Sequence, residues 1–353
     1  MSSTDWQQPG GGYPGPAPAK RWPFLRIAIA VILLAALAWV LLLTAQYCKT
    51  KQPLSIVPPP VADLFDKASF QYVDSIDGLQ NPMGVAVAED GRIYVTETGG
   101  ERLIHIYNSR WQEVGSFAPA DTVPAGRVPV YVAVSPKGDV YVSDRNVATI
   151  FIFSADGKPK GKVAAPKGFE DWHPLGLTFD GAGNLYVSDV TPEKHRVVVL
   201  DPAGKLKLSF GSQGEKEGQF WFPNGIAVDS EGRIFVADSN NGRMQAFDKD
   251  GKFLFKISRG MSRGDLSIPR GIAVDSKDRL LIADTYRGAV QAYAISDSED
   301  SDSGSTPLEY IGGFSGSAAD GVFLLFPNGL ALDGHGKIYV ADRTNNRVQI
   351  WKY

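Results

Sequence analysis

A motif that recurs six times between Pro82 and Tyr353 constrains the fold of this chain more than any other feature. Each copy starts with a proline and contains a short apolar run, a turn, a second apolar run that ends in an acid, and a third run. Successive starting prolines lie 47, 45, 49, 46 and 58 residues apart. This period is typical of the blades of a β-propeller. The six starting prolines are Pro82, Pro129, Pro174, Pro223, Pro269 and Pro327.

The copy PNGIAVDSEGRIFVADSNNGRMQAF shows how one blade is expected to fold. Residues 225–228 are all apolar or glycine, as an inner strand buried on both faces should be. Residues 229–232 have the composition of a hairpin turn, and residues 233–237 alternate like a half-buried strand. The pattern predicts a third strand over 244–247 and a fourth over 252–256.

These repeats resemble the NHL repeat, and the resemblance covers residues 69–353. It implies an all-β domain, a six-bladed β-propeller of the NHL type with four-stranded blades. The last copy stops at Tyr353 after its third strand, while residues 70–73 form an isolated apolar segment ahead of the first copy. We therefore expect an N-terminal strand to complete the last blade and close the ring, which leaves no open edge.

The residues before the propeller divide into three segments. Residues 1–23 are rich in Gly and Pro and are expected to be disordered. Residues 24–48 contain a 22-residue run without charge, 27–48, which predicts one transmembrane helix long enough for a bilayer core of about 30 Å. The run exceeds the apolar part of a signal peptide, so we favour an uncleaved anchor over that alternative. Residues 49–68 are a proline-containing linker to the propeller at 69–353.

Charge predicts the orientation of this anchor and narrows the choice of partners. Three basic residues precede the apolar run and two follow it, a small bias that places the N-terminus in the cytoplasm. We therefore expect a single-pass protein of the cell membrane, with an extracytoplasmic propeller in a bacterial envelope. Residues 53–353 carry 38 acidic and 31 basic side chains, so nucleic acid is not expected as a partner.

The acid that ends the second strand of every copy is expected to be structural. A role repeated in each blade explains all the acids at once, with each one accepting hydrogen bonds from its own turn or from an arginine. An arginine follows five residues later in three copies and seven residues later in one, whereas Thr149 and Ala289 stand there in two others. The acids are Glu97, Asp144, Asp189, Asp238, Asp284 and Asp342, and the arginines are Arg102, Arg196, Arg243 and Arg347.

The face where the chain enters each inner strand is the predicted binding surface. The residue after the starting proline is apolar in three consecutive blades and polar in the next three, and aromatic residues lie nearby. These aromatics either anchor a ligand or pack the joints between blades. The binding candidates are Met83, Tyr131, Trp172, His173, Trp221, Asn224, Arg270 and Asn328, with Val130 and Leu175 completing the apolar half.

Two related groups of propeller enzymes provide a test for catalysis. Peptidyl-amidoglycolate lyases hold zinc through histidines placed just after the starting proline, and no copy here has histidine at that position. The four histidines, His105, His173, His195 and His335, are expected in different places. Gluconolactonase-like propellers bind a divalent metal on the axis through a glutamate of the first blade and an asparagine and an aspartate of later blades. Asn224 and Asn328 resemble part of that pattern, but the first blade offers no acid.

These comparisons lead to an expectation of no catalytic residue, no metal and no cofactor. The predicted function is a non-catalytic binding or scaffolding module for a protein, peptide or glycan partner of the envelope. The alternative is a metal-dependent hydrolase or lactonase that uses the central funnel. The acidic run at 296–303 lengthens the fifth spacing and is expected to be a solvated insertion, because its spacing does not match a calcium loop.

Overall fold

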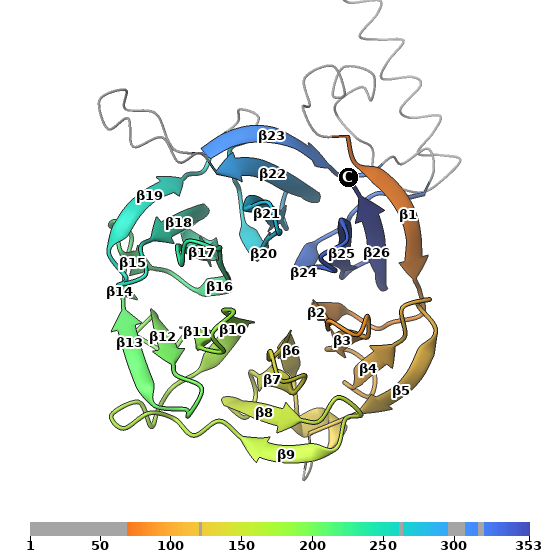
Figure 1. The fold of residues 1–353 in the computed structure, drawn as a ribbon, viewed down its shortest axis with the longest axis horizontal. Helices are drawn as coiled ribbons and strands as arrows, with labels where there is room; N and C mark the ends of the chain where they lie inside the picture. Colours follow the sequence, from red (N-terminus) through yellow and green to blue (C-terminus); the bar gives the residue numbers. More distant parts are fainter. Residues whose placement is uncertain (1–68, 120–121, 261–263, 296–307, 317–320) are drawn as a thin grey trace, which may run out of the picture. The chain divides into compact units, whose positions relative to one another are not determined.

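The computed structural model describes residues 69–353 apart from 120–121, 261–263, 296–307 and 317–320. Within these residues, six four-stranded antiparallel sheets form blades around a central axis (Figure 1). Each inner strand contacts the inner strands of the two neighbouring blades, so the ring is closed. The predicted all-β, six-bladed propeller with four-stranded blades is confirmed.

The strands follow the repeats closely. Blades one and two comprise β2 (Pro82–Val87), β3 (Ile93–Glu97), β4 (Ile104–Tyr107), β5 (Glu113–Phe117), β6 (Pro129–Val134), β7 (Val140–Asp144), β8 (Thr149–Phe153) and β9 (Pro159–Lys162). Blades three and four comprise β10 (Pro174–Phe179), β11 (Leu185–Asp189), β12 (Arg196–Leu200), β13 (Leu206–Phe210), β16 (Pro223–Val228), β17 (Ile234–Asp238), β18 (Arg243–Phe247) and β19 (Phe253–Ile257). Blades five and six comprise β20 (Pro269–Val274), β21 (Arg279–Asp284), β22 (Ala289–Ile295), β23 (Leu308–Phe314), β24 (Pro327–Leu332), β25 (Lys337–Asp342), β26 (Arg347–Lys352) and β1 (Gln71–Ile76). A short parallel pair, β14 (Ser212–Gln213) and β15 (Gln219–Phe220), lies between blades three and four in the sequence.

Strand β1 closes the ring as expected. It pairs antiparallel with β26, with Gln71 opposite Lys352 and Ser75 opposite Gln349 (Figure 1). The strand runs further than the predicted 70–73, because Ile76 at its end is buried in the core between blades six and one. The outermost strand of blade six therefore comes from the N-terminal side of the propeller.

The apolar core is divided among the joints between blades. One cluster of buried side chains lies between each pair of neighbouring blades. Between blades one and two, for example, Tyr94 of β3 and Phe153 of β8 belong to the same cluster and are almost completely buried. Each blade packs its two apolar faces against the neighbouring blades, so a single repeat cannot bury its apolar side chains alone.

The predicted membrane anchor lies outside the residues that the structure describes. No helix in the described part of the chain is long and apolar enough to cross a bilayer. The segments 1–23, 24–48 and 49–68 and the acidic run 296–303 lie outside the described residues.

Glycine two residues after the starting proline allows neighbouring inner strands to approach closely. It occurs in every blade except blade two, where Tyr131 stands instead. A Cβ atom added to Gly271 would lie 2.0 Å from the carbonyl oxygen of Asn328 in the next blade. That distance is far shorter than any van der Waals contact, so a larger residue would push blades five and six apart.

We therefore expect Gly271→Ala to lower the free energy of unfolding by about 1–3 kcal/mol, as overpacking of a tight site does. The control is Gly115→Ala in β5, where an added Cβ meets no atom within 4 Å. Urea denaturation of both variants checks the prediction. Equal stability of the two variants would show that the inner strands can relax around the methyl group.

Candidate binding face

The loops leading into the inner strands and the loops joining second to third strands lie at the same end of every blade. The register shows this directly, because Pro223 at the start of β16 pairs with Asp238 at the end of β17, and the other blades repeat the pairing. We call this end the funnel face. Its two sets of positions are Met83, Val130, Leu175, Asn224, Arg270 and Asn328 after the prolines, and Thr98, Arg145, Val190, Ser239, Thr285 and Arg343 after the blade acids.

The blade acids hold the loops beneath this face. The carboxylate of Asp238 accepts hydrogen bonds from the backbone N–H of Trp221 (2.7 Å), from the side-chain amides of Asn241 and Gln245, and from Arg243 Nε (2.7 Å). Asp342 repeats this arrangement in blade six. These contacts fit the structural role predicted for the acids and their arginines.

Blades without an arginine at the usual position satisfy their acids in other ways. Asp189 pairs with Arg196 at 2.8 Å, across the longer turn of blade three. Asp284 has Arg287 at 3.5 Å, three residues away, in place of Ala289. Asp144 accepts hydrogen bonds from backbone N–H groups in the lead-in loop and the turn of blade two.

Arg102 does not follow the predicted pattern. Its guanidinium donates to the backbone carbonyls of Pro124 and Arg127, and no ion pair joins it to Glu97 among the described residues. The turn of blade one is one residue longer than that of blade four, so Leu103 lies opposite Glu97. His105 occupies the neighbouring site, with Nε2 at 3.3 Å from the Glu97 carboxylate. Arg102 therefore links two loops, and it is not a hydrogen-bond donor to the acid of its own blade among the described residues.

The apolar half of the funnel face forms one cluster. Val130, Leu175 and Tyr131 are buried together with Val190, and Met83 packs against them. In the polar half, Arg270 Nη1 donates to Asn328 Oδ1 at 3.0 Å. The Asn224 amide donates to Ser239 Oγ at 2.7 Å, and the Tyr131 hydroxyl lies 3.5 Å from Asn224 Oδ1. The division between apolar and polar blades seen in the sequence is thus also a division of contacts beneath the face, where Asn224 and Asn328 are themselves buried.

The aromatic candidates differ in exposure. Trp172 is buried in the core between blades two and three, so its ring packs a joint and does not present a surface. Trp221 is 45% exposed. Tyr286 and Phe326, which the sequence analysis did not select, are 72% and 46% exposed on loops of the same face. Blades four to six therefore carry an exposed aromatic rim.

Two histidines lie next to the funnel face without forming a metal centre. The backbone N–H of Phe222 donates to His195 Nδ1 at 3.1 Å, and burial lowers the pKa of His195, which favours the neutral ring as acceptor. His173 lines a small cavity nearby. No group of three or more His, Cys, Asp or Glu side chains that could hold a metal occurs in the part of the chain that the structure describes.

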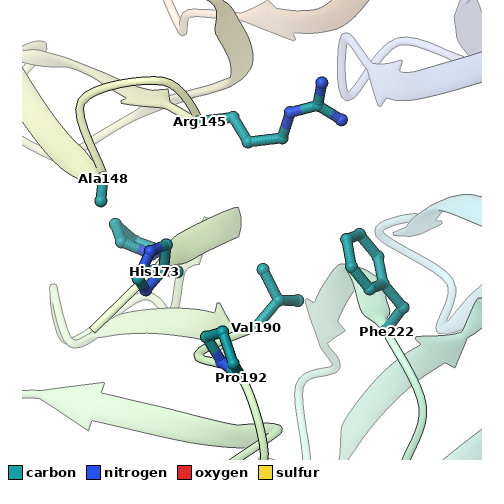
Figure 2. Close-up of a pocket in the computed structure, with 7 residues that line it drawn as sticks. Arg145, Ala148, His173, Val190, Pro192 and Phe222 are labelled. Atoms are coloured by element: carbon teal, nitrogen blue, oxygen red, sulfur yellow. The ribbon is translucent and has the colours of Figure 1, made fainter. Parts of the chain in front are cut away.

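That cavity lies over the apolar half of the face and has a volume of about 200 Å³. Figure 2 shows His173, Val190, Pro192 and Phe222 around it, with the side chain of Arg145 extending from its loop at one side. Ala148 and Pro174 complete the lining. An apolar group of the size of one side chain fits this space.

Arg145 and Arg343 are funnel-face residues that the sequence analysis missed. Each directly follows a blade acid, a position where the other blades have Thr, Val or Ser. Burial, and then the like charges of Arg270 and Arg145, lower the pKa of the Arg343 guanidinium below its ordinary value. An alignment of the six copies at the residue after the acid would have shown both arginines.

Known sequences match this chain through its repeats. The NHL repeat family matches residues 220–247, 266–293 and 324–351, which cover most of blades four to six. The E3 ubiquitin-protein ligase TRIM71 of Rattus norvegicus is 36% identical over 215 residues, 54% of this chain and 24% of TRIM71. The B-box type zinc finger protein ncl-1 of Caenorhabditis elegans is 37% identical over 95 residues, 25% of this chain and 11% of ncl-1. The chain thus matches about a quarter or less of the length of these relatives.

Solved structures with low sequence identity share the fold. Virginiamycin B lyase from Staphylococcus aureus superposes with a TM-score of 0.52 at 14% identity, covering 81% of this chain and 99% of the lyase. Hydrazine synthase of Kuenenia stuttgartiensis gives a TM-score of 0.53 at 15% identity, covering 78% and 96%. Such likeness extends to the architecture alone. Sequence and structure together show that this chain carries NHL repeats and folds as a six-bladed β-propeller.

Proposed function

We propose that the propeller is a non-catalytic module that binds a protein partner on its funnel face. The observation that carries the proposal is the aromatic rim, in which Trp221, Tyr286 and Phe326 remain exposed on one face. Exposed aromatic side chains gathered on one surface are typical of protein-binding sites. The relative TRIM71 is an E3 ubiquitin-protein ligase, a protein whose activity is directed at other proteins. In its most specific form, the proposal is that the partner is a protein, peptide or glycan of the envelope.

The chemistry of the funnel does not favour the alternative, a metal-dependent hydrolase or lactonase. None of the twelve funnel-face positions is acidic, and three of them are arginine. The amide oxygen of Asn328 already accepts a hydrogen bond from Arg270, a cation that would repel a metal ion. The axial cavity bordered by Tyr131 has a volume of about 40 Å³, far below the 300–1,000 Å³ or so of ordinary ligand sites.

The proposal includes the placement of the module. Residues 24–48 would anchor the chain in the cell membrane, with residues 1–23 in the cytoplasm and residues 49–68 leading to an extracytoplasmic propeller. The length of the uncharged run supports this arrangement. The bacterial envelope remains part of the proposal, and the relatives named above come from animals. A cysteine-accessibility assay on intact cells, with single cysteines introduced at Ser3 and Lys137 in a Cys48→Ser background, checks the orientation.

A site-specific photo-crosslinker tests the binding function. Benzoylphenylalanine at position 286 on the aromatic rim is expected to give a discrete protein adduct in cells that express the full chain. The control position is His335, which is exposed in the β24–β25 hairpin at the opposite end of a blade. Adducts of equal yield from both positions, or from neither, would contradict a partner on the funnel face.

A further inference from the structure

Three arginines stand at funnel-face positions of separate blades around the axis of the propeller. Arg145 belongs to blade two, Arg270 to blade five and Arg343 to blade six. Blades two and five lie opposite each other in the ring (Figure 1). The strand register nevertheless puts all three at the funnel-face end of their blades. Arg270 Nη1 also reaches Asn328 of blade six, the blade that carries Arg343. The lowered pKa of Arg343, caused by burial and then by the like charges of Arg270 and Arg145, agrees with this placement. Burial raises the pKa of the Tyr131 phenol, and the positive charge of Arg270 opposes part of that rise.

No carboxylate neutralises this cluster within the described residues. The nearby blade acids are engaged below it, and no ion pair involves any of the three arginines. The only side-chain hydrogen bond from the cluster to a described residue joins Arg270 Nη1 to Asn328 Oδ1. The Nε atoms of Arg270 and Arg343 are buried without a hydrogen-bond partner. Placing three like charges together weakens a fold, and buried donors normally have acceptors, so the cluster is suited to an anion supplied from outside.

An apolar cavity adjoins the cluster and narrows the chemistry of the ligand that carries the anion. Arg145 borders the cavity of about 200 Å³ whose other walls include Val190, Pro192 and Phe222 (Figure 2). A ligand with a carboxylate next to an aliphatic or aromatic group would satisfy both features at once. Peptides with an acidic residue beside a hydrophobic residue have this chemistry.

We propose that the funnel face recognises an acidic peptide segment of the partner protein, with its carboxylates bound by Arg145, Arg270 and Arg343 and an adjacent apolar side chain in the cavity. This inference rests on the proposed protein-binding function and names the chemistry of the partner. Guanidinium groups bind carboxylates through paired hydrogen bonds, which gives both strength and orientation.

The charge distribution favours a peptide over a nucleic acid. Residues 69–353 carry 36 acidic and 30 basic side chains, and the twelve funnel-face positions contain no lysine. A nucleic-acid surface needs cations spread along the path of the backbone. Here the cations are three arginines placed around one axis, and two of them have buried Nε atoms.

The test uses the purified full chain in detergent micelles and a random peptide display library. The wild-type chain is expected to enrich peptides that carry Asp or Glu beside a hydrophobic residue. The variant Arg145→Gln/Arg270→Gln/Arg343→Gln should bind the selected peptides at least tenfold more weakly, the minimum expected from loss of charged hydrogen bonds. The control Lys137→Gln/Lys158→Gln/Lys277→Gln has the same change in charge at exposed positions of the opposite hairpins and should bind like wild type.

Each remaining outcome has a defined meaning. Amidated peptides distinguish two sources of the carboxylate. If amidation abolishes binding, the carboxylate is that of a chain end; if binding is unchanged, the carboxylates are those of side chains. Absence of acidic enrichment, or equal loss in both triple variants, overturns the proposal. Arginine-dependent capture of a random RNA library without peptide enrichment overturns it in favour of nucleic acid. If the crosslink from position 286 persists in the arginine variant while acidic selection fails, protein binding stands and only the anion site is wrong.

Discussion

Asp238→Ala is expected to lower the free energy of unfolding by about 3–5 kcal/mol, the cost of leaving a buried charge without its partner. Asp238 is completely buried and its carboxylate accepts hydrogen bonds from four groups, including Arg243 Nε at 2.7 Å. The Arg243 side chain is only 7% exposed, so water cannot replace the lost carboxylate. Backbone carbonyls of the preceding loop would still accept from Arg243, but they carry no full charge.

Asp144→Ala provides the matched control for this prediction. Asp144 holds the same position in blade two and is equally buried, but its donors are backbone N–H groups. Its loss leaves neutral donors unsatisfied and should cost about 1–3 kcal/mol. Urea denaturation, monitored by tryptophan fluorescence, measures both variants. Equal losses would mean that the ion pair with Arg243 is not what makes blade four depend on its acid.

The repeats predicted the fold correctly because the recurring residues have the same local structural role in every blade. The proline that starts the inner strand, the glycine that permits close approach and the acid that holds the loops recur in register, as Pro223, Gly225 and Asp238 do in blade four. Each of these features acts within one blade or on its nearest neighbour. Alignment of the copies is then sufficient to place the strands, and the extension of β1 to Ile76 was missed because that segment has no repeat to compare with.

The exposure of the aromatic candidates shows where this reasoning fails. Trp172 and Trp221 each stand two residues before the starting proline, yet one is buried and the other exposed. The hydrogen bond to the blade acid comes from the N–H of Trp221 in blade four but from that of His173 in blade three. Blade four has an extra residue in this loop, Phe222, at a φ of 61°. Trp221 therefore corresponds to His173, and counting from the proline misaligns the two loops.

The arginine cluster was missed for a different reason. Arg145 and Arg343 are almost 200 residues apart in the sequence, and neither copy looks unusual when it is read alone. Their relation depends on the closure of the ring, which places the non-adjacent blades two and six around one axis (Figure 1). A repeat motif predicts what each blade contains, whereas a site shared by several blades depends on how the ring closes.

Replacing residues 71–76 with an equal-length Gly–Ser segment is expected to remove at least about 4 kcal/mol of stability, since truncating one buried Ile alone costs about 2–5 kcal/mol. The change deletes strand β1 and withdraws Ile76 from the core between blades six and one. It also removes the edge-on contact of Tyr72 with Trp351, whose ring centroids are 5.6 Å apart. Beyond these contacts, β26 becomes an open edge, so the two ends of the propeller lose the strand that joins them.

Replacement of β9, Pro159–Lys162, with a Gly–Ser segment of equal length is the control, because it distinguishes the effect of ring closure on stability from the effect of losing an outer strand. All four residues of β9 are exposed, and the strand joins no distant parts of the chain. Its replacement should cost no more than about 1 kcal/mol, as surface changes away from the core usually do. Hydrogen exchange of the full-length variants adds a local measurement: without β1, amides of β24–β26 should exchange faster than those of β16–β19. Uniform acceleration in all blades would instead mean that the ring opens as one cooperative unit, and similar stability of the two variants would contradict a closing role for β1.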